Sequence, residues 1–187
     1  MTKLNLTEEL VSLKIDLKEL FGRSVPDEDL RQIIADDLIS VIVERTTSGY
    51  GVENGKSVKF KKYSKAYAKK TGKKQVNLDE SGGMLNSIHL IDSTSRSIEI
   101  GIDDDHAPQA HGHMTGQYGQ GPLPRRSFLG LTDQDLKKIK SKYRREVQSL
   151  STQTAKDFLN QGPDEILGIT SDDIRDALKA LNRRGFF

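Results

Sequence analysis

The segment from Ile88 to Ile102 limits the fold most strongly, because apolar and polar residues alternate on both sides of a turn. Ile88 and Leu90 come before the turn-like sequence DSTSR, and Ile98, Ile100 and Ile102 come after it. In a strand, every second side chain points to the same face. The segment therefore predicts an antiparallel hairpin with one buried face.

The beginning of the chain carries leucines at helical spacing. Leu10, Leu13, Leu17 and Leu20 are three, four and three positions apart. A threonine at position 7 is a good N-cap residue, and a glycine at position 22 is a helix stop. The pattern predicts an amphipathic N-terminal helix.

A second helix is expected from Pro26 to about Arg45. The proline suits the first turn, and the three acidic residues after it lie where the helix dipole favours negative charge. Its apolar residues cover more than the usual single stripe: Leu30, Ile33, Ile34, Leu38, Ile39, Val41, Ile42 and Val43. We therefore expect this core helix to be buried on more than one side.

After the second helix the composition turns to Gly, Ser, Thr and Asn as far as Ser57, which favours a connection. Val58 and Phe60 then alternate, and Tyr63 and Tyr67 are four positions apart. This change of period indicates a short strand that runs into a short basic helix.

Between Asp103 and Ser127 the apolar periodicity is lost, and Gly and Pro are frequent. We expect a long loop here, and a loop of this length inside a compact domain is usually functional or disordered. Order returns at Thr132 and Asp135, which form a plausible N-cap pair. A long helix is expected from there to about Leu159.

Together these elements predict an α+β fold with N-terminal helices, a small antiparallel sheet with a hairpin, a long loop and C-terminal helices. Residues 1–160 are expected to form a single domain, and residues 161–187 a C-terminal helical extension. Apolar residues make up 34% of the chain and charged residues 30%, which suffices for one core with much polar surface.

The absence of cysteine from the chain excludes a disulfide framework, a thiolate nucleophile and a Cys-based zinc site. No apolar run approaches the roughly 20 residues that a membrane helix needs. The opening MTKLNLTEEL lacks the apolar core of a signal peptide. We therefore expect an intracellular protein without membrane contact.

Potential metal ligands cluster in one segment: Asp103, Asp104, Asp105, His106, His111 and His113. These side chains suit zinc or iron, but they lie in a Gly-rich segment without a helical i, i+4 pair. No recognisable nucleophile motif or phosphate-binding glycine loop accompanies them. We expect no enzyme activity and no cofactor, with a metal-dependent hydrolase built on the three histidines as an alternative.

Nine lysines and no acidic residue lie between Glu53 and Asp79, and three aromatic residues are interleaved with them. The block from Lys56 to Lys74 has three interpretations: a nucleic-acid surface, a solvated face above aromatic core anchors, or a surface for an acidic neighbour in an assembly. The predicted basic face consists of Lys59, Lys61, Lys62, Lys65, Lys69 and Lys70.

The sequence PLPRRSFLGL, residues 122–131, directly precedes the expected long helix, and we name it the strap. Its prolines fix an extended path that donates no backbone hydrogen bonds at those positions. Its Phe and Leu residues are expected to anchor that path in the core or in a groove of a neighbour. The predicted subunit interface consists of Pro122, Pro124, Arg125, Arg126, Phe128 and Leu129.

Four ordered motifs resemble a known family. LPRRSFLGL is similar to the signature of the phage virion-morphogenesis or tail-completion proteins, and HAPQAHGH followed by YG is similar to the His-Gly element before it. Upstream, FKKYSKAYAKKTG and NLDESGGMLNSI resemble the family's aromatic YS, YA and K pattern and the turn that opens its hairpin. The chain differs where His106 replaces the family's aromatic residue, and it is longer after about Leu150.

The resemblance implies a non-enzymatic structural protein of the virion of a tailed bacteriophage. Such a protein acts at the head-to-tail junction, the neck, or at the end of the tail. Several copies, with a hexamer expected, would form a ring that contacts adjoining neck or tail proteins and possibly DNA in the channel. The protein would be made in the cytoplasm of the host bacterium. Nucleic-acid binding through the basic block stays the alternative function.

Overall fold

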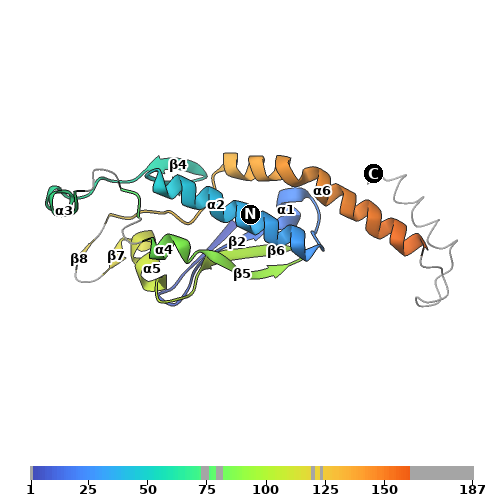
Figure 1. Cartoon of the computed structure of the whole chain (residues 1–187), viewed down its shortest axis with the longest axis horizontal. Coiled ribbons are helices and arrows are strands. Elements are labelled where there is room, and N and C mark those ends of the chain that lie inside the picture. The colour runs from blue at the N-terminus through green and yellow to red at the C-terminus, as the bar shows by residue number, and fades with distance from the viewer. Residues whose placement is uncertain (1, 73–75, 79–81, 119–120, 123, 161–187) are drawn as a thin grey trace. The chain divides into compact units, whose positions relative to one another are not determined.

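The computed structural model describes residues 2–72, 76–78, 82–118, 121–122 and 124–160, and its architecture is α+β, as predicted (Figure 1). The chain divides into two compact units, Met1–Arg144 and Arg145–Phe187. In the second unit, the described residues continue one long helix. The expected helical extension, residues 161–187, lies outside the described residues.

A four-stranded antiparallel sheet forms the centre of the first unit, with the strand order β1-β2-β6-β5. The strands are β1 Thr2–Leu6, β2 Val11–Asp16, β5 His89–Thr94 and β6 Ser97–Ile102. The central pair sets Val11 opposite Ile102, Leu13 opposite Ile100 and Ile15 opposite Ile98. All six side chains are buried, so this face of the sheet forms one side of the hydrophobic core. The predicted hairpin is confirmed as β5 and β6.

The predicted core helix is α2, Glu28–Thr47, which packs against β5 and β6 (Figure 1). Asp27 caps it by accepting a hydrogen bond from the backbone N–H of Leu30 at 2.7 Å. Its inward residues Ile34 and Leu38 are fully buried. Of the apolar residues expected to be buried on more than one side, Ile33 alone is exposed, at 51% and within a polar outer stripe, and the others are buried or half-buried.

The predicted N-terminal helix was mostly wrong, because β1 and β2 occupy this segment and only α1, Leu17–Phe21, is helical. Thr7 lies in the turn between the strands, where its hydroxyl accepts from the backbone N–H of Leu10. The segment has the helical spacing of its leucines and also a strand-like alternation at Val11, Leu13 and Ile15. Pairing with β6 favoured the strand. Gly22 ends α1 in the left-handed conformation, as expected of the helix stop.

The segment expected to be a connection contains a second hairpin, β3 Tyr50–Glu53 paired with β4 Lys56–Lys59. Its turn residues Asn54 and Gly55 both have positive φ, 49° and 71°. Asn-Gly is a strong hairpin signal because both residues tolerate this backbone conformation. The Asn-Gly pair thus indicated a hairpin, whereas the Gly, Ser, Thr and Asn composition around it favoured a connection.

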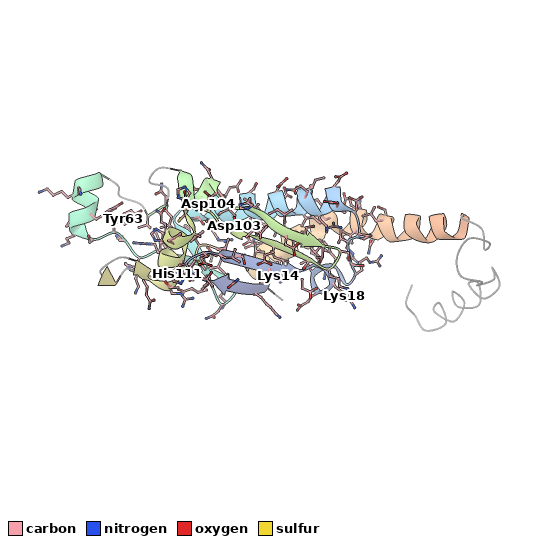
Figure 2. The ribbon with its side chains drawn as sticks, turned by 90° about the horizontal axis from the view of Figure 1, so that it is seen from below. Lys14, Lys18, Tyr63, Asp103, Asp104 and His111 are labelled. Atoms are coloured by element: carbon pink, nitrogen blue, oxygen red, sulfur yellow. The ribbon has the colours of Figure 1, made fainter. Side chains whose placement is uncertain are left out.

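The basic helix is present as α3, Lys65–Thr71, capped by Ser64 and ended by Gly72. It has no substantial packing contact with any other described helix or strand. Figures 1 and 2 both show it apart from the four-stranded sheet. We call residues 61–72 the basic arm.

The expected long loop contains a helix, α5, Ala107–Thr115, followed by the short strands β7 Gln117–Tyr118 and β8 Gly121–Pro122. A proline in its first turn and Gly116 at its C-cap are ordinary helix boundary signals. The helix escaped prediction because small side chains form much of its buried face, Ala107 and Ala110 among them. The short helix α4, Gly83–Asn86, contacts it.

The long helix is α6, Asp133–Asn160, and its predicted cap is confirmed. The backbone N–H of Thr132 donates to Asp135 Oδ2 at 2.9 Å, and the backbone N–H of Asp135 donates to Thr132 Oγ1 at 3.0 Å. Farther along, the hydroxyl of Tyr143 donates to Asp37 Oδ2 at 2.5 Å. This contact links the first turns of α6 to α2.

Candidate assembly site

The strap runs between α5 and the β3–β4 hairpin and is held by backbone hydrogen bonds to both. The N–H of Arg126 donates to the carbonyl of His113 at 2.7 Å. On the other side, the N–H of Val52 donates to the carbonyl of Ser127 at 2.7 Å. The strap therefore occupies a fixed path through the first unit of the chain.

The strap buries most of its side chains within the chain itself. Phe128 is fully buried and Leu129 is 1% exposed, so both belong to the core of the same chain. Pro124 is half-buried and Arg125 is exposed. Of the predicted interface residues, these two offer accessible side chains, and the side chain of Pro122 lies outside the description. Arg125 also donates from Nε to the carbonyl of Met114 at 3.0 Å.

Arg45 of α2 ties the strap to the start of α6. Its Nη1 lies 2.7 Å from Asp135 Oδ2, and its Nη2 donates to the carbonyls of Phe128 and Gly130. Burial lowers the pKa of Arg45, while the Asp135 carboxylate opposes this shift. The guanidinium of Arg45 thus binds one carboxylate of α6 and two carbonyls of the strap through charge-assisted hydrogen bonds.

Arg126 joins the strap to the root of the basic arm. Its guanidinium carbon lies 5.2 Å from the centre of the Tyr63 ring, within the range of a cation–π contact. The ring centres of Tyr63 and Tyr67 are 4.7 Å apart. Burial lowers the pKa of Arg126, and the nearby tyrosines oppose the shift. The strap and the basic block, which the sequence presented as separate, meet here; Figure 2 shows Tyr63 beside α3.

The predicted basic face is exposed throughout. Its members Lys59, Lys61, Lys62, Lys65, Lys69 and Lys70 all have exposed side chains. Phe60 is buried, in agreement with its interpretation as a core anchor. Tyr63 and Tyr67 are half-buried and contact each other, so the exposed surface of this segment is dominated by its lysines.

The histidines considered as potential metal ligands are divided among different positions of α5. His106 is at the N-cap position, and His111 and His113 lie two residues apart on the helix, which turns their side chains to different sides. Burial, followed by the charge of Arg126, lowers the pKa of His113 to about 4. Within the described ranges, no three His, Cys, Asp or Glu side chains are grouped so that they could hold a metal ion.

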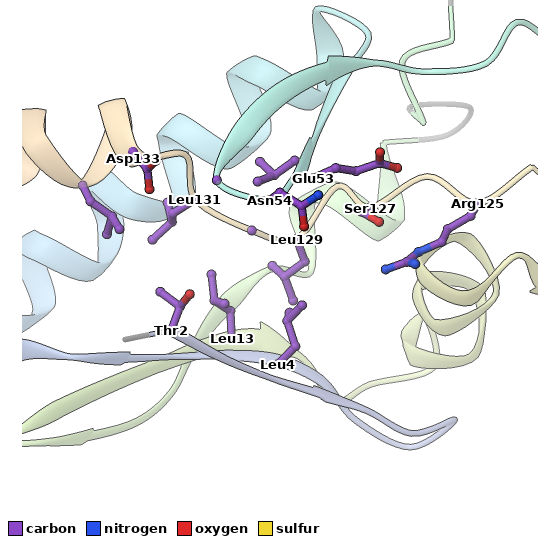
Figure 3. Close-up of a pocket in the computed structure, with 14 residues that line it drawn as sticks. Thr2, Leu4, Leu13, Glu53, Asn54, Arg125, Ser127, Leu129, Leu131 and Asp133 are labelled. Atoms are coloured by element: carbon purple, nitrogen blue, oxygen red, sulfur yellow. The ribbon is translucent and has the colours of Figure 1, made fainter.

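A pocket of about 530 Å³ lies beside the strap, and sequence reasoning missed it. Figure 3 shows Leu4 and Leu13 of the sheet below Leu129 and Leu131 of the strap. Leu4 is 48% exposed, although it lies on the core face of edge strand β1. The alternation of Leu4 and Leu6 with Lys and Asn was the available signal, and the expected N-terminal helix concealed it.

Comparison of the chain with protein-family models, curated proteins and solved structures finds no match. In the part of the chain that the structure describes, no helix combines the length and the apolar character needed to span a membrane.

We predict that Phe128→Ala lowers the free energy of unfolding by roughly 3–5 kcal/mol, because it removes a fully buried ring and leaves a cavity. Chemical denaturation followed by circular dichroism measures this loss. Leu4→Ala, at a half-exposed position, is the control and is expected to have a much smaller effect. A loss below about 1 kcal/mol for Phe128→Ala would contradict the assignment of this ring to the core.

The free energy of unfolding is expected to fall as the pH drops from about 6.5 to about 4, because His113 is protonated more readily in the unfolded chain than in the folded one. The contribution of His113 to stability is fully present above about pH 6.5 and is lost by about pH 4, and this loss is at most roughly 3 kcal/mol. His113→Gln should flatten the pH dependence relative to His111→Gln on the same helix. Equal slopes for the two variants would count against this origin.

Proposed function

We propose that the chain is a structural subunit of a tailed-phage virion that forms a ring, with six copies expected, at the head-to-tail junction or the tail end. There it would complete or join the tail through contacts with adjoining neck or tail proteins. In this proposal the protein is not an enzyme and needs no cofactor.

The observation that carries the proposal is the convergence of the four family-like motifs. Tyr63 comes from the first motif, α4 from the second, His113 from the third and Arg126 from the fourth. Arg126 contacts both Tyr63 and His113, and α4 contacts α5. Residues of motifs that are distant in sequence thus contact one another in the fold. This favours a shared function over four chance similarities.

The exposed basic arm is the second support for an assembly role. A seven-residue helix gains little stability from its own backbone hydrogen bonds, because helix nucleation is unfavourable. Since α3 has no substantial contact with another described helix or strand, a contact outside the chain is the natural source of its further stabilisation. Subunits of closed rings supply such contacts from one copy to the next.

Arg125→Glu is expected to leave the monomer folded, because the side chain is exposed, and to reduce the number of particles with joined heads and tails. The readouts are thermal unfolding of the purified variant and complementation of a phage that lacks this gene. Glu8→Lys, a charge reversal at another exposed position, is the control. Normal completion of infectious particles by Arg125→Glu would argue against the strap as an interface.

The location itself is tested by cryo-electron microscopy of particles from the source, with symmetry left free at the junction between capsid and tail. The proposal expects a ring of this chain at the junction or at the tail end. A mature particle without the chain would overturn it.

Nucleic-acid binding is the second candidate, and the exposure of all six lysines of the basic face favours it. Lysines that neutralise phosphates produce an affinity that falls steeply with salt concentration. Changing Lys59, Lys61, Lys62 and Lys65 to Glu should then abolish salt-sensitive binding of duplex DNA by the isolated protein. Unchanged binding by this variant would remove the candidate.

A further inference from the structure

The basic arm presents charge of one sign. Every charged residue from Lys61 to Gly72 is a lysine, and the side chains of Lys65 and Lys69 lie one helical turn apart on α3. The contact of Arg126 with Tyr63, and that of Tyr63 with Tyr67, hold the root of the arm against the strap. The arm therefore carries a basic helix, and its root is held in place by the strap.

The outer face of α2 carries the opposite charge. Every exposed charged side chain of this helix is acidic, and its two arginines are turned inward. The acidic residues of this stripe are Glu28, Asp29, Asp36 and Glu44. Ile33 lies between Asp29 and Asp36 and is 51% exposed, which adds an apolar contact point to the stripe.

We propose that the basic arm of one copy binds the acidic stripe on α2 of a second copy. This inference rests on the proposed function, because it names the contact by which neighbouring subunits of the ring recognise each other. The occupant of the stripe is thus a helix of the same chain, with lysine ammonium groups for its carboxylates and lysine methylene stems for Ile33.

Two features make the contact intermolecular. Within one chain, α3 has no substantial contact with α2. The two surfaces also differ from each other, so the contact is head-to-tail, and repeated head-to-tail contacts generate either a closed ring or an open filament. Because each copy offers one arm and one stripe, each copy can contact two neighbours, as a ring requires.

Charge complementarity of this kind sets the partner and the orientation more than the affinity. Exposed charge pairs are screened by salt over a distance of about 8 Å at physiological ionic strength. Self-association is therefore expected to weaken as the salt concentration rises. The exposed Ile33 supplies a contribution that salt does not screen.

The test is a charge exchange between two variants of the full chain. The arm variant carries Lys65→Glu and Lys69→Glu, and the stripe variant carries Asp29→Lys and Asp36→Lys. Each alone brings like charges together and should lose roughly a hundredfold in self-association. In a 1:1 mixture, the reversed arm meets the reversed stripe and the native arm meets the native stripe, so association should return.

The measurement is sedimentation velocity at low and high salt, with circular dichroism to verify that each variant is folded. Control variants with equal charge changes elsewhere, Lys137→Glu with Lys138→Glu and Glu8→Lys with Glu9→Lys, should associate as the native chain does. Native association in both single variants, a mixture that stays dissociated, or a native chain that stays monomeric at low salt would each overturn the inference.

Two further outcomes separate this inference from its alternatives. An arm variant that loses DNA binding but still self-associates would assign the arm to nucleic acid and overturn the contact proposed here. If the native chain is located in a ring on the particle and the arm variant enters that ring normally, the proposed function stands and this inference fails. Absence of the native chain from the particle would defeat the proposed function instead.

Discussion

Arg45 makes the contact on which the strap, α2 and α6 jointly depend. Its guanidinium reaches two strap carbonyls and the carboxylate of Asp135, which also completes the N-cap of α6. A largely buried guanidinium is expensive unless its charge and its donors are matched, and here one carboxylate and two carbonyls match the charge and the two Nη groups, whereas Nε has no hydrogen-bond partner among the described residues. Because that match requires the strap and the helix start to lie at fixed positions, Arg45 determines the path along which Phe128 enters the core.

The second contact that organises the structure is that of Arg126 with Tyr63. It pairs a cation with an aromatic ring, and it joins the strap to the basic arm. Arg126 is 4% exposed and faces Tyr63, while its Nε has no hydrogen-bond partner in the described part of the chain. A cation in this position favours a neutral His113 and fixes the root of the arm. The strap thus acts as an internal brace whose outer edge, at Pro124 and Arg125, is accessible to another molecule.

Much of the fold could be predicted where a pattern is long and supported by boundary residues. The hairpin at Ile88–Ile102, helix α2 and the Thr132 cap of α6 all followed from local signals. Prediction failed where two periods compete, as at Val11–Ile15, and where small residues hide the buried face, as in α5. At Asn54 and Gly55 the sequence contains a hairpin signal, but the surrounding composition favoured a connection instead.

By itself, the sequence determined which residues carry charge, which segments alternate, where helices α2 and α6 begin and that cysteine chemistry is absent. It also determined the four motifs that support the proposed function. Only the tertiary structure decided that Phe128 belongs to the chain's own core and that Arg126 meets Tyr63. It alone showed an acidic stripe on α2 and a basic helix α3 without substantial contact with another described helix or strand. The physical reason is that local pattern sets backbone preference, whereas burial and charge pairing depend on contacts between residues far apart in the chain.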